Sequence, residues 1–322
     1  MGLKICVIGV YFGTFPDYIS LWLRSCEKNP TIDFLIFSDH AIESTPDNVQ
    51  IIHMTLQEMK NRAQNLFDFP ISLDRPYKCC DYKPIYGLIF QDFLKQYDYW
   101  GHCDFDLIFG DLSKFFEQYE LTSYDKFLSL GHLCLYRNTL ENNYRFMLDG
   151  SECGSYNTVY SSEQNFAFDE TRGINKIYKK HKFPMFEKRI FADISKIYKR
   201  YRLALDDINY DKQLFFWRNG KTYRMYYENG RLCEEEFMYV HFKERGKLDY
   251  TEECLSCSSF FITNKGFFAN DKQEIMLNDI EKHNQFLGSF YEKCELIKYK
   301  VSSVCIRIKD NVLKIFGIYN IR

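Results

Sequence analysis

The stretch DYWGHCDFDLIFGDL, residues 98–112, places two aspartates, Asp104 and Asp106, between two apolar runs. Residues 99–103 have the composition of a β-strand, so we expect a strand that delivers both carboxylates. Side chains two positions apart on an extended chain point to the same face, where two negative charges repel each other. Carboxylates in apolar surroundings need a cation or hydrogen-bond donors. The pair therefore predicts a positively charged partner at the end of a central strand.

The segments around this stretch alternate between strand-like and helix-like patterns. Short apolar runs predict a buried strand at residues 3–10 and further strands at residues 34–37, 49–52 and 127–136. Helical patterns occur at residues 18–26, 56–66 and 83–96. Such alternation indicates an α/β fold with much parallel pairing, in which the carboxyl ends of the strands meet at one edge of the sheet. Past residue 140 the pattern loosens.

Length, charge and cysteine content narrow the class of protein. The 322 residues, 46% of them hydrophobic, suffice for one large domain or one domain with an appended subdomain. The net charge of −2 argues against a dedicated nucleic-acid-binding protein. We find no secretory signal and no apolar run of membrane-spanning length, so the 12 cysteines predict reduced thiols and a cytoplasmic protein. Cys254-x-x-Cys257 lacks a second pair and is a weak zinc motif.

A D-x-D at the end of a strand suits a divalent metal ion with a phosphorylated ligand. Mg²⁺ and Mn²⁺ prefer carboxylate oxygens, take one or two from protein, and complete their coordination with phosphate and water. A D-x-D alone occurs by chance on many surfaces. Here apolar residues lie on both sides of the motif. A metal site on Asp104 and Asp106 is therefore a better interpretation than two acids on a solvated surface.

The run Lys78-Cys-Cys-Asp81-Tyr-Lys83-Pro84, followed by the D-x-D, resembles the core of GT-A-fold, nucleotide-sugar-dependent glycosyltransferases of bacterial capsule and surface-polysaccharide clusters. The resemblance covers residues 3–110. It implies an α/β fold with a GT-A-like (Rossmann-like) mixed sheet flanked by helices, and helical or irregular C-terminal additions. It also implies Mn²⁺ or Mg²⁺ on the D-x-D and a nucleotide diphosphate donor, a UDP-sugar first of all. The donor-binding residues it implies are Tyr11, Asp39, Asp81, Lys83 and Asp104.

A later segment, Met238-Tyr-Val-His241-Phe-Lys243, resembles the same family at one further point. Several metal-dependent members carry a late histidine as a metal ligand and a nearby lysine on the donor phosphates. The resemblance therefore implies His241 as a third metal ligand and Lys243 as a donor ligand. On an extended segment the two side chains share one face. The alternative is a core histidine beside a solvated lysine.

Two adjacent acids, Asp169 and Glu170, are the candidate catalytic residues. A transferase that inverts the anomeric carbon needs a carboxylate to deprotonate the acceptor hydroxyl. The same acids would also suit a sugar-hydroxyl ligand, or the start of a helix, where the helix dipole favours negative charge. These three interpretations remain open at this point. The expected acceptor is a capsular polysaccharide or a lipid-linked oligosaccharide.

The expected domain organisation has a single boundary. Residues 1–245 are expected to form the catalytic domain, with a nucleotide-binding half of about 1–110 and an acceptor-side half of 111–245, and residues 246–322 a helical extension. Residues 176–202 hold ten Lys or Arg and predict a basic amphipathic helix on an anionic membrane surface. A C-terminal stripe has the same character; it comprises Val301, Val304, Cys305, Ile308, Val312, Ile315 and Phe316, beside Lys309 and Lys314. An ordinary core-facing helix is the alternative for both.

Two other functions fit parts of the sequence. Asp104-Phe-Asp106 also resembles the nucleophile loop of haloacid-dehalogenase-type phosphatases, in which the first aspartate is phosphorylated. That loop normally follows the first strand, whereas about a hundred residues of α/β pattern precede it here. A non-enzymatic binding protein with an aromatic-rich surface would require the D-x-D, His241 and the acid pair all to be incidental.

Overall fold

The computed structural model describes residues 2–204, 207–243, 247–272 and 274–315. The chain divides into two compact units. Unit 1 comprises Met1–Ala192, Trp217–Thr222 and Phe237–His241, and unit 2 comprises Asp193–Phe216, Tyr223–Glu236 and Phe242–Arg322. The division therefore falls at several points of the chain, whereas the sequence suggested one boundary at residue 245. Arg245 and Phe316 lie outside the described residues.

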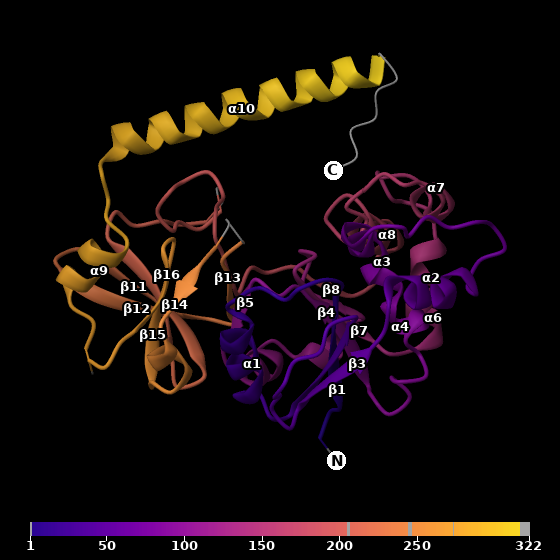
Figure 1. Cartoon of the computed structure of the whole chain (residues 1–322), viewed down its shortest axis with the longest axis horizontal. Helices are drawn as coiled ribbons and strands as arrows, with labels where there is room; N and C mark the ends of the chain where they lie inside the picture. The colour runs from indigo at the N-terminus through magenta and orange to yellow at the C-terminus, as the bar shows by residue number, and fades with distance from the viewer. Residues whose placement is uncertain (1, 205–206, 244–246, 273, 316–322) are drawn as a thin grey trace. The chain divides into compact units, whose positions relative to one another are not determined.

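A seven-stranded sheet forms the centre of unit 1 (Figure 1). Its strands, in sheet order, are β3 (Val49–His53), β2 (Ile32–Ser38), β1 (Ile5–Tyr11), β4 (Tyr99–Cys103), β7 (Leu133–Arg137), β6 (Lys126–Phe127) and β8 (Met185–Phe186). The first four are parallel, and β7 is antiparallel to β4. The mixed sheet and its helices confirm the predicted α/β class.

Helices cover both faces of this sheet because its strands are apolar on both sides. On β1, Val7 belongs to the same buried cluster as Trp22, whereas its neighbour Ile8 packs in the cluster of Phe37 and Trp100. The Val7 side is covered by α1 (Ile19–Glu27) and α5 (Leu112–Gln118). The Ile8 side is covered by α2 (Leu56–Gln64), α3 (Cys79–Tyr82), α4 (Tyr86–Ile89), α7 (Tyr156–Ser161) and α8 (Ile174–His181).

Further short helices lie in the connections. They are α6 (Leu140–Tyr144) and the 3₁₀ turns η1 (Pro76–Lys78), η2 (Lys83–Ile85), η3 (Leu121–Ser123), η4 (Arg145–Met147) and η5 (Glu252–Leu255). The predicted single helix over residues 83–96 is wrong, since only Lys83–Ile89 is helical there, as η2 and α4. Pro84 lies in the first turn, where its missing N–H is tolerated, and the helix instead ends at Ile89, after which the chain continues in turns.

The predicted strand over residues 127–136 is also wrong. It is a hairpin in which β6 and β7 pair antiparallel. Leu128 has a φ of 71°, a left-handed conformation that ends β6, and the chain turns back before Leu133. The turn contains Gly131 and His132, so these two residues lie next to the strand end that carries Asp104, whose backbone N–H donates to the His132 carbonyl at 2.9 Å.

The predicted basic amphipathic helix over residues 176–202 is wrong as well. Helix α8 ends at His181, because Lys182 adopts a left-handed conformation with a φ of 57° and Pro184 follows. Beyond it the chain forms β8 and the short β9 (Ala192–Asp193). Of the five apolar residues expected on the membrane face, Ile197 is half-buried and four are buried: Phe186, Ile190, Ile194 and Tyr201.

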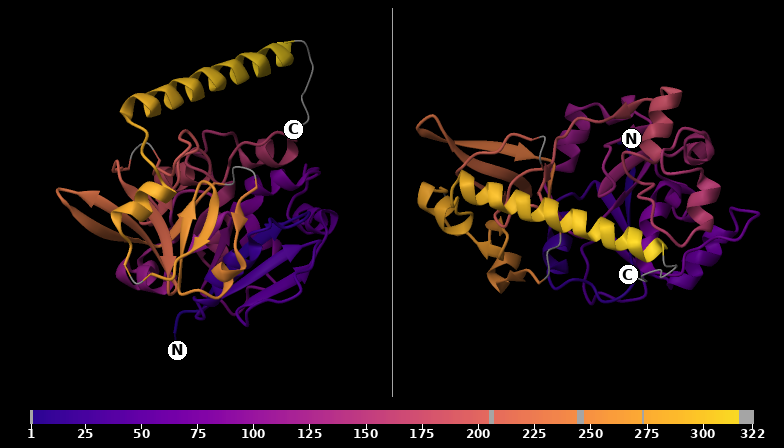
Figure 2. Two further views of the ribbon diagram at one scale, coloured as in Figure 1. Left: turned by 60° about the vertical axis from the view of Figure 1, so that its left-hand side comes forward. Right: turned by 90° about the horizontal axis from the view of Figure 1, so that it is seen from above.

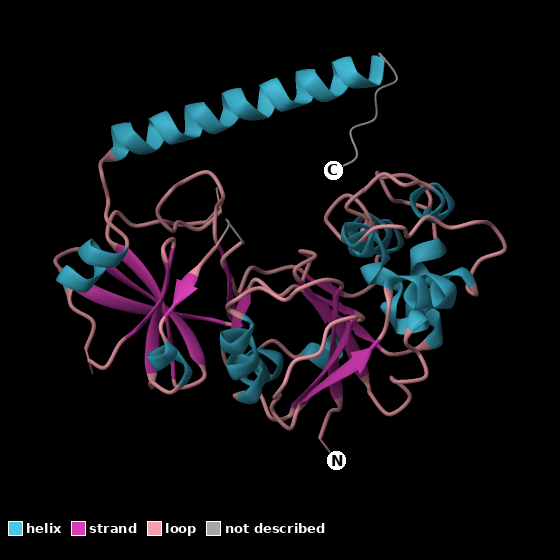
Figure 3. Cartoon of the chain, in the orientation of Figure 1, coloured by secondary structure: helices cyan, strands magenta, loops and turns pink. Residues whose placement is uncertain are grey.

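Unit 2 is built around a second sheet, of six strands, and two helices (Figure 3). The strands, in sheet order, are β12 (Arg231–Phe237), β11 (Lys221–Glu228), β10 (Gln213–Arg218), β15 (Ser259–Thr263), β16 (Gly266–Ala269) and β14 (Asp249–Tyr250). Its core includes Leu214, Phe261 and Ile280. The expected helical extension begins only at α9 (Leu277–His283), followed by the long α10 (Ser289–Ile315), which is one continuous helix in every view (Figure 2). Among the described residues, no helix is long and apolar enough to cross a membrane.

Candidate functional site

Asp104 and Asp106 directly follow β4, at the carboxyl ends of the four parallel strands of unit 1. The strand order reverses between β1 and β4. After β1 the chain adds β2 and then β3 on one side of β1, and it returns to add β4 on the other side. In open α/β sheets, ligands bind outside the strand ends at such a switch point. The D-x-D therefore lies where the topology places a ligand.

A small sheet brings His241 to the D-x-D from a distant part of the sequence. Strand β5 (Leu107–Phe109), immediately after the aspartates, pairs antiparallel with β13 (Tyr239–His241), and its register sets His241 opposite Leu107. As a result, the imidazole Nε2 of His241 lies 3.3 Å from the Oδ2 of Asp106. The histidine is 7% exposed. Backbone pairing thus holds this side chain against the acidic pair.

The three side chains form a set suited to a divalent ion. One ligand atom from each of Asp104, Asp106 and His241 lies within 4.8 Å of the others. Two carboxylates and one imidazole fit Mn²⁺ well and Mg²⁺ less well, because Mg²⁺ prefers oxygen alone. The half-buried carboxylates leave one side of the set accessible for water or phosphate.

Lys83 contributes a cation beside this set. Its Nζ lies 2.7 Å from Asp104 Oδ1 and 3.2 Å from Asp169 Oδ2, and it donates to the Gly131 carbonyl at 2.8 Å. Burial alone would lower the pKa of Lys83, but the charges of Asp104 and Asp169 outweigh it and raise the pKa well above its usual value. Lys83 is therefore a positive charge that joins Asp104 to Asp169.

The acidic pair is packed against the turn between β6 and β7. A Cβ atom on Gly131 would lie 2.3 Å from Asp169 Oδ2 and 3.0 Å from Glu170 Oε1, so only glycine leaves room for both carboxylates. Burial, opposed by Lys83, raises the pKa of Asp169 to about 7, and burial also raises the pKa of Glu170. Gly131 was not among the residues predicted from the sequence, although a glycine inside an apolar run often marks a close backbone approach.

The raised pKa of Asp169 predicts a pH-dependent stability. Between pH 3.8, the ordinary carboxyl pKa, and about pH 7, Asp169 is protonated more often in the folded chain than in the unfolded chain. The contribution of Asp169 to the free energy of unfolding therefore falls as the pH rises through this range. The Asp169→Asn variant removes the titration. We expect its free energy of unfolding, relative to the unchanged chain, to rise by on the order of 4 kcal/mol across that range. Urea unfolding at several pH values measures this, and parallel profiles would contradict it.

Asp81 lies behind the acidic pair and is completely buried. Its carboxylate receives the Lys78 ammonium at 2.8 Å and the backbone N–H groups of Phe166 and Phe168 at 3.0–3.2 Å. These contacts hold the segment that leads into Asp169. The structure thus gives Asp81 a supporting position, and its assignment as a donor ligand stays a prediction.

Tyr11 and Asp39 lie at the ends of β1 and β2, two strands of the same parallel set. The Tyr11 ring stacks on Phe15 with centroids 5.0 Å apart and meets Phe105 edge-on. Asp39 accepts a hydrogen bond from the Gly13 backbone N–H at 2.8 Å, which together with His40 lowers the pKa of its carboxyl. Tyr11 is half-buried and Asp39 is exposed. Both are placed to contact a ligand at the carboxyl edge of the sheet.

Two further side chains are placed differently. His132, in the turn between β6 and β7, is buried, and its ring centroid lies 4.2 Å from that of His241. Lys243 belongs to unit 2, where its ammonium lies 2.8 Å from Asp193. Its expected role at the donor phosphates therefore stays a prediction.

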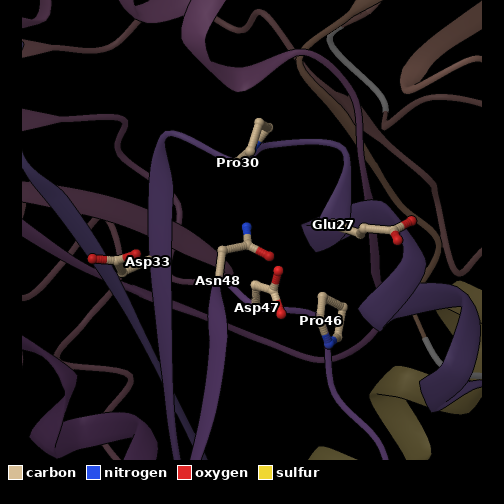
Figure 4. A pocket seen from close by; sticks show the side chains of 6 residues that line it. All are labelled: Glu27, Pro30, Asp33, Pro46, Asp47 and Asn48. Atoms are coloured by element: carbon tan, nitrogen blue, oxygen red, sulfur yellow. The ribbon is translucent and has the colours of Figure 1, made fainter.

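A shallow pocket of about 380 Å³ lies at the opposite edge of the seven-stranded sheet (Figure 4). It is lined by residues from the end of α1, the start of β2 and the loop before β3: Glu27, Pro30, Asp33, Pro46, Asp47 and Asn48. Asn48 uses its amide to hold three backbone carbonyls, those of Cys26, Asn29 and Ile32. The polar groups of this pocket therefore hold neighbouring loops together. The six residues that line it do not belong to the candidate site.

Several solved structures share partial similarity with the chain. The galactosyltransferase LgtC, in complex with donor and acceptor sugar analogues, is 8% identical over 58% of this chain and 75% of its own, with a TM-score of 0.32. Mouse xyloside xylosyltransferase 1 is 7% identical over 60% of this chain and 89% of its own, with a TM-score of 0.39. Glycosyltransferase GlyE from Streptococcus pneumoniae TIGR4 is 14% identical over 58% of this chain and 46% of its own, with a TM-score of 0.34.

No curated protein sequence matches the chain. A family model does, over residues 7–271, and its span takes in the whole of the candidate site from Tyr11 to His241. The matched residues make up well over half of the chain. The chain therefore belongs to DUF6625, a family of unknown function.

Proposed function

We propose that this protein is a metal-assisted glycosyltransferase that moves a sugar from a nucleotide diphosphate donor to a hydroxyl group of a glycan. One observation carries the proposal: Asp104, Asp106 and His241 converge at the switch point of the parallel sheet, with ligand atoms within 4.8 Å. A diphosphate has oxygens to complete the coordination of an ion held there. The resemblance of residues 3–110 to GT-A enzymes supports the same function.

The proposed donor site extends along the carboxyl edge of the sheet. Asp104, Asp106 and His241 would hold Mn²⁺ or Mg²⁺, which when bound would neutralise charge on the departing nucleotide diphosphate. Tyr11 and Asp39 are proposed to bind the nucleoside, with UDP as the first choice. Lys83 holds Asp104 in place, Asp81 supports the neighbouring segment, and Lys243 is proposed for the donor phosphates.

The acidic pair is proposed for the acceptor side. In the reaction the bond between the sugar C1 and the diphosphate oxygen breaks and its electron pair leaves with the diphosphate. The acceptor oxygen forms the new bond to C1 and gives its proton to a base. Glu170 is the better base of the two, because it is half-buried, whereas Asp169 is 3% exposed and paired with Lys83. This assignment applies if the anomeric configuration is inverted.

The Glu170→Gln variant is expected to lower kcat by about a hundredfold or more, because the amide keeps the shape of the side chain but takes up no proton. The affinity for the nucleotide donor should stay the same. Glu163→Gln is the matched control, since Glu163 is an exposed acid of the same segment. Steady-state kinetics with donor and acceptor measure both. Normal turnover in an Asp169→Asn/Glu170→Gln double variant would remove the pair from the catalytic residues.

We also propose where the acceptor and the enzyme are found. The acceptor class is a bacterial capsular or cell-surface polysaccharide, or its lipid-linked precursor. A cytoplasmic location is supported by the cysteines, since all 12 are free thiols and burial raises the pKa of several, among them Cys26 and Cys103. The proposed site at the membrane is the inner face.

Hydrolysis of UDP-, GDP-, dTDP- and CMP-sugars, each with and without Mn²⁺, tests the proposal. We expect slow, Mn²⁺-dependent release of nucleotide from one donor class, and UDP first. No release from any donor with metal present would contradict the proposal. Covalent phosphate trapped on Asp104 by a phosphate analogue would favour the phosphatase instead.

A further inference from the structure

Helix α10 carries an exposed apolar stripe. Phe290, Ile297, Val301 and Val304 recur at intervals of seven, four and three residues, so they lie on one side of the helix. Their side chains are 81%, 60%, 57% and 53% exposed. Burying such side chains would be favourable because it removes apolar surface from water. Within the described part of the chain, this stripe is therefore an uncovered apolar surface.

Lysines border this stripe on both sides. At 100° per residue, Lys293 and Lys300 lie along one edge and Lys298 along the other. All three are exposed, and within the described residues none of their ammonium groups pairs with a carboxylate. The sequence keeps the same spacing further on, with Arg307 and Lys314 seven and fourteen residues after Lys300. The exposed side of α10 is thus apolar at its centre and positive at its edges.

The acids of α10 lie on its opposite side and hold it to unit 2. Glu292 is 7% exposed and pairs with Arg200 at 2.5 Å and with Arg202. Glu295 is also buried, and its carboxylate accepts the Lys199 backbone N–H at 3.3 Å. These contacts fix the rotation of the first turns of α10. They turn the negative charges toward the protein and leave the apolar and positive side to the solvent.

We infer that α10 docks on an anionic lipid surface, lying in the plane of the membrane with its apolar stripe in the lipid and Lys293, Lys298 and Lys300 at the headgroups. This combination of an apolar face and a basic border is typical of interfacial helices. An anionic lipid surface is the partner we infer, because its negative charge complements the lysines that border the stripe. A second copy of α10 packed in parallel on this stripe would bring Lys293 and Lys300 of one helix toward Lys298 of the other, and these like charges repel.

This docking surface replaces the one expected in residues 176–202. Two central lysines of that segment are engaged within unit 1, where Lys179 pairs with Glu187 and Lys180 with Asp149, both at 2.6 Å. Their apolar neighbours are in the core. The inference does not rest on the proposed sugar transfer, because binding to vesicles is measured without donor or acceptor.

Co-sedimentation of the full chain with vesicles tests the inference. We expect binding to phosphatidylcholine vesicles that contain phosphatidylglycerol, weaker binding as salt is added, and none to phosphatidylcholine alone. The triple variant Lys293→Glu/Lys298→Glu/Lys300→Glu should lower the partition coefficient on the order of a hundredfold. The uncharged variant Ile297→Ser/Val301→Ser should lower it as well, since it removes part of the apolar stripe.

The control variant Lys179→Glu/Lys180→Glu/Lys196→Glu changes the net charge by the same amount outside α10 and should keep most of the binding. An equal loss in both triple variants would contradict the inference, as would equal binding to neutral and anionic vesicles or binding to neither. Sedimentation velocity covers the second-copy alternative. A dimer that Ile297→Asp dissociates would mean that the stripe is an interface between two chains.

Discussion

The Asp106→Asn variant is expected to lose at least about a hundredfold in turnover while its free energy of unfolding stays nearly unchanged. The amide has the shape of the carboxylate but lacks its negative charge, so the affinity for Mn²⁺ falls with the turnover. His241, which lies 3.3 Å from the Asp106 carboxylate, keeps its place because the backbone pairing of β13 with β5 holds it. Steady-state kinetics with increasing Mn²⁺ measure the effect.

The free energy of unfolding should change little because Asp104 and Asp106 share one face, where removing one negative charge relieves their repulsion. Asp47→Asn is the matched control, since Asp47 is an exposed acid at the opposite edge of the same sheet. It should change neither turnover nor metal affinity. Full Mn²⁺-dependent turnover in Asp106→Asn would mean that the metal site has been assigned to the wrong residues.

The Lys83→Met variant is expected to lose both stability and activity. Met has a similar length but leaves Asp104 and Asp169 without their shared cation, and removing one partner of a buried ion pair costs about 3 kcal/mol. Because Asp104 is about a third exposed, most of that cost should come from Asp169. Turnover should fall because Asp104 and the acidic pair lose the group that positions them. Urea unfolding and kinetics measure the two effects.

The cost of Lys83→Met should depend on pH. Lys83 lowers the pKa of Asp169, so its removal raises this pKa above about 7. The penalty is then largest above neutral pH and smaller near pH 5, where Asp169 is protonated with or without Lys83. The double variant Lys83→Met/Asp169→Asn should recover part of the stability at high pH. Lys60→Met, which breaks the surface pair with Asp74, is the control and should cost less than about 1 kcal/mol.

The first half of the fold could be predicted because its signals are local. The buried strands β1 and β2 are largely apolar runs, and the alternation of strand and helix patterns in this half of the chain indicates parallel pairing. The D-x-D was found because two carboxylates inside an apolar stretch need a physical reason. Its position after β4 follows from the same pattern.

The later errors have different physical causes. The basic segment after residue 176 has helical spacing, but Lys182 and Pro184 end the helix, and tertiary packing buries the rest in extended chain. The turn at Gly131 was hidden in an apolar run that looked like one strand. The pairing of β13 with β5, which brings His241 to Asp106, depends on long-range contacts that a local pattern does not contain. His241 was found only through a resemblance, and Lys83 was assigned to the donor without its link to Asp169.

The most direct test of the proposed function is a thermal unfolding experiment with UDP and Mn²⁺, alone and together, on the unchanged chain and on Asp106→Asn. We predict that UDP raises the unfolding temperature only when Mn²⁺ is present, because the ion joins the nucleotide diphosphate to Asp104, Asp106 and His241. We predict no such increase in Asp106→Asn. An equal increase with the metal chelated, or in the Asp106→Asn variant, would contradict a metal-assisted donor site at the end of β4.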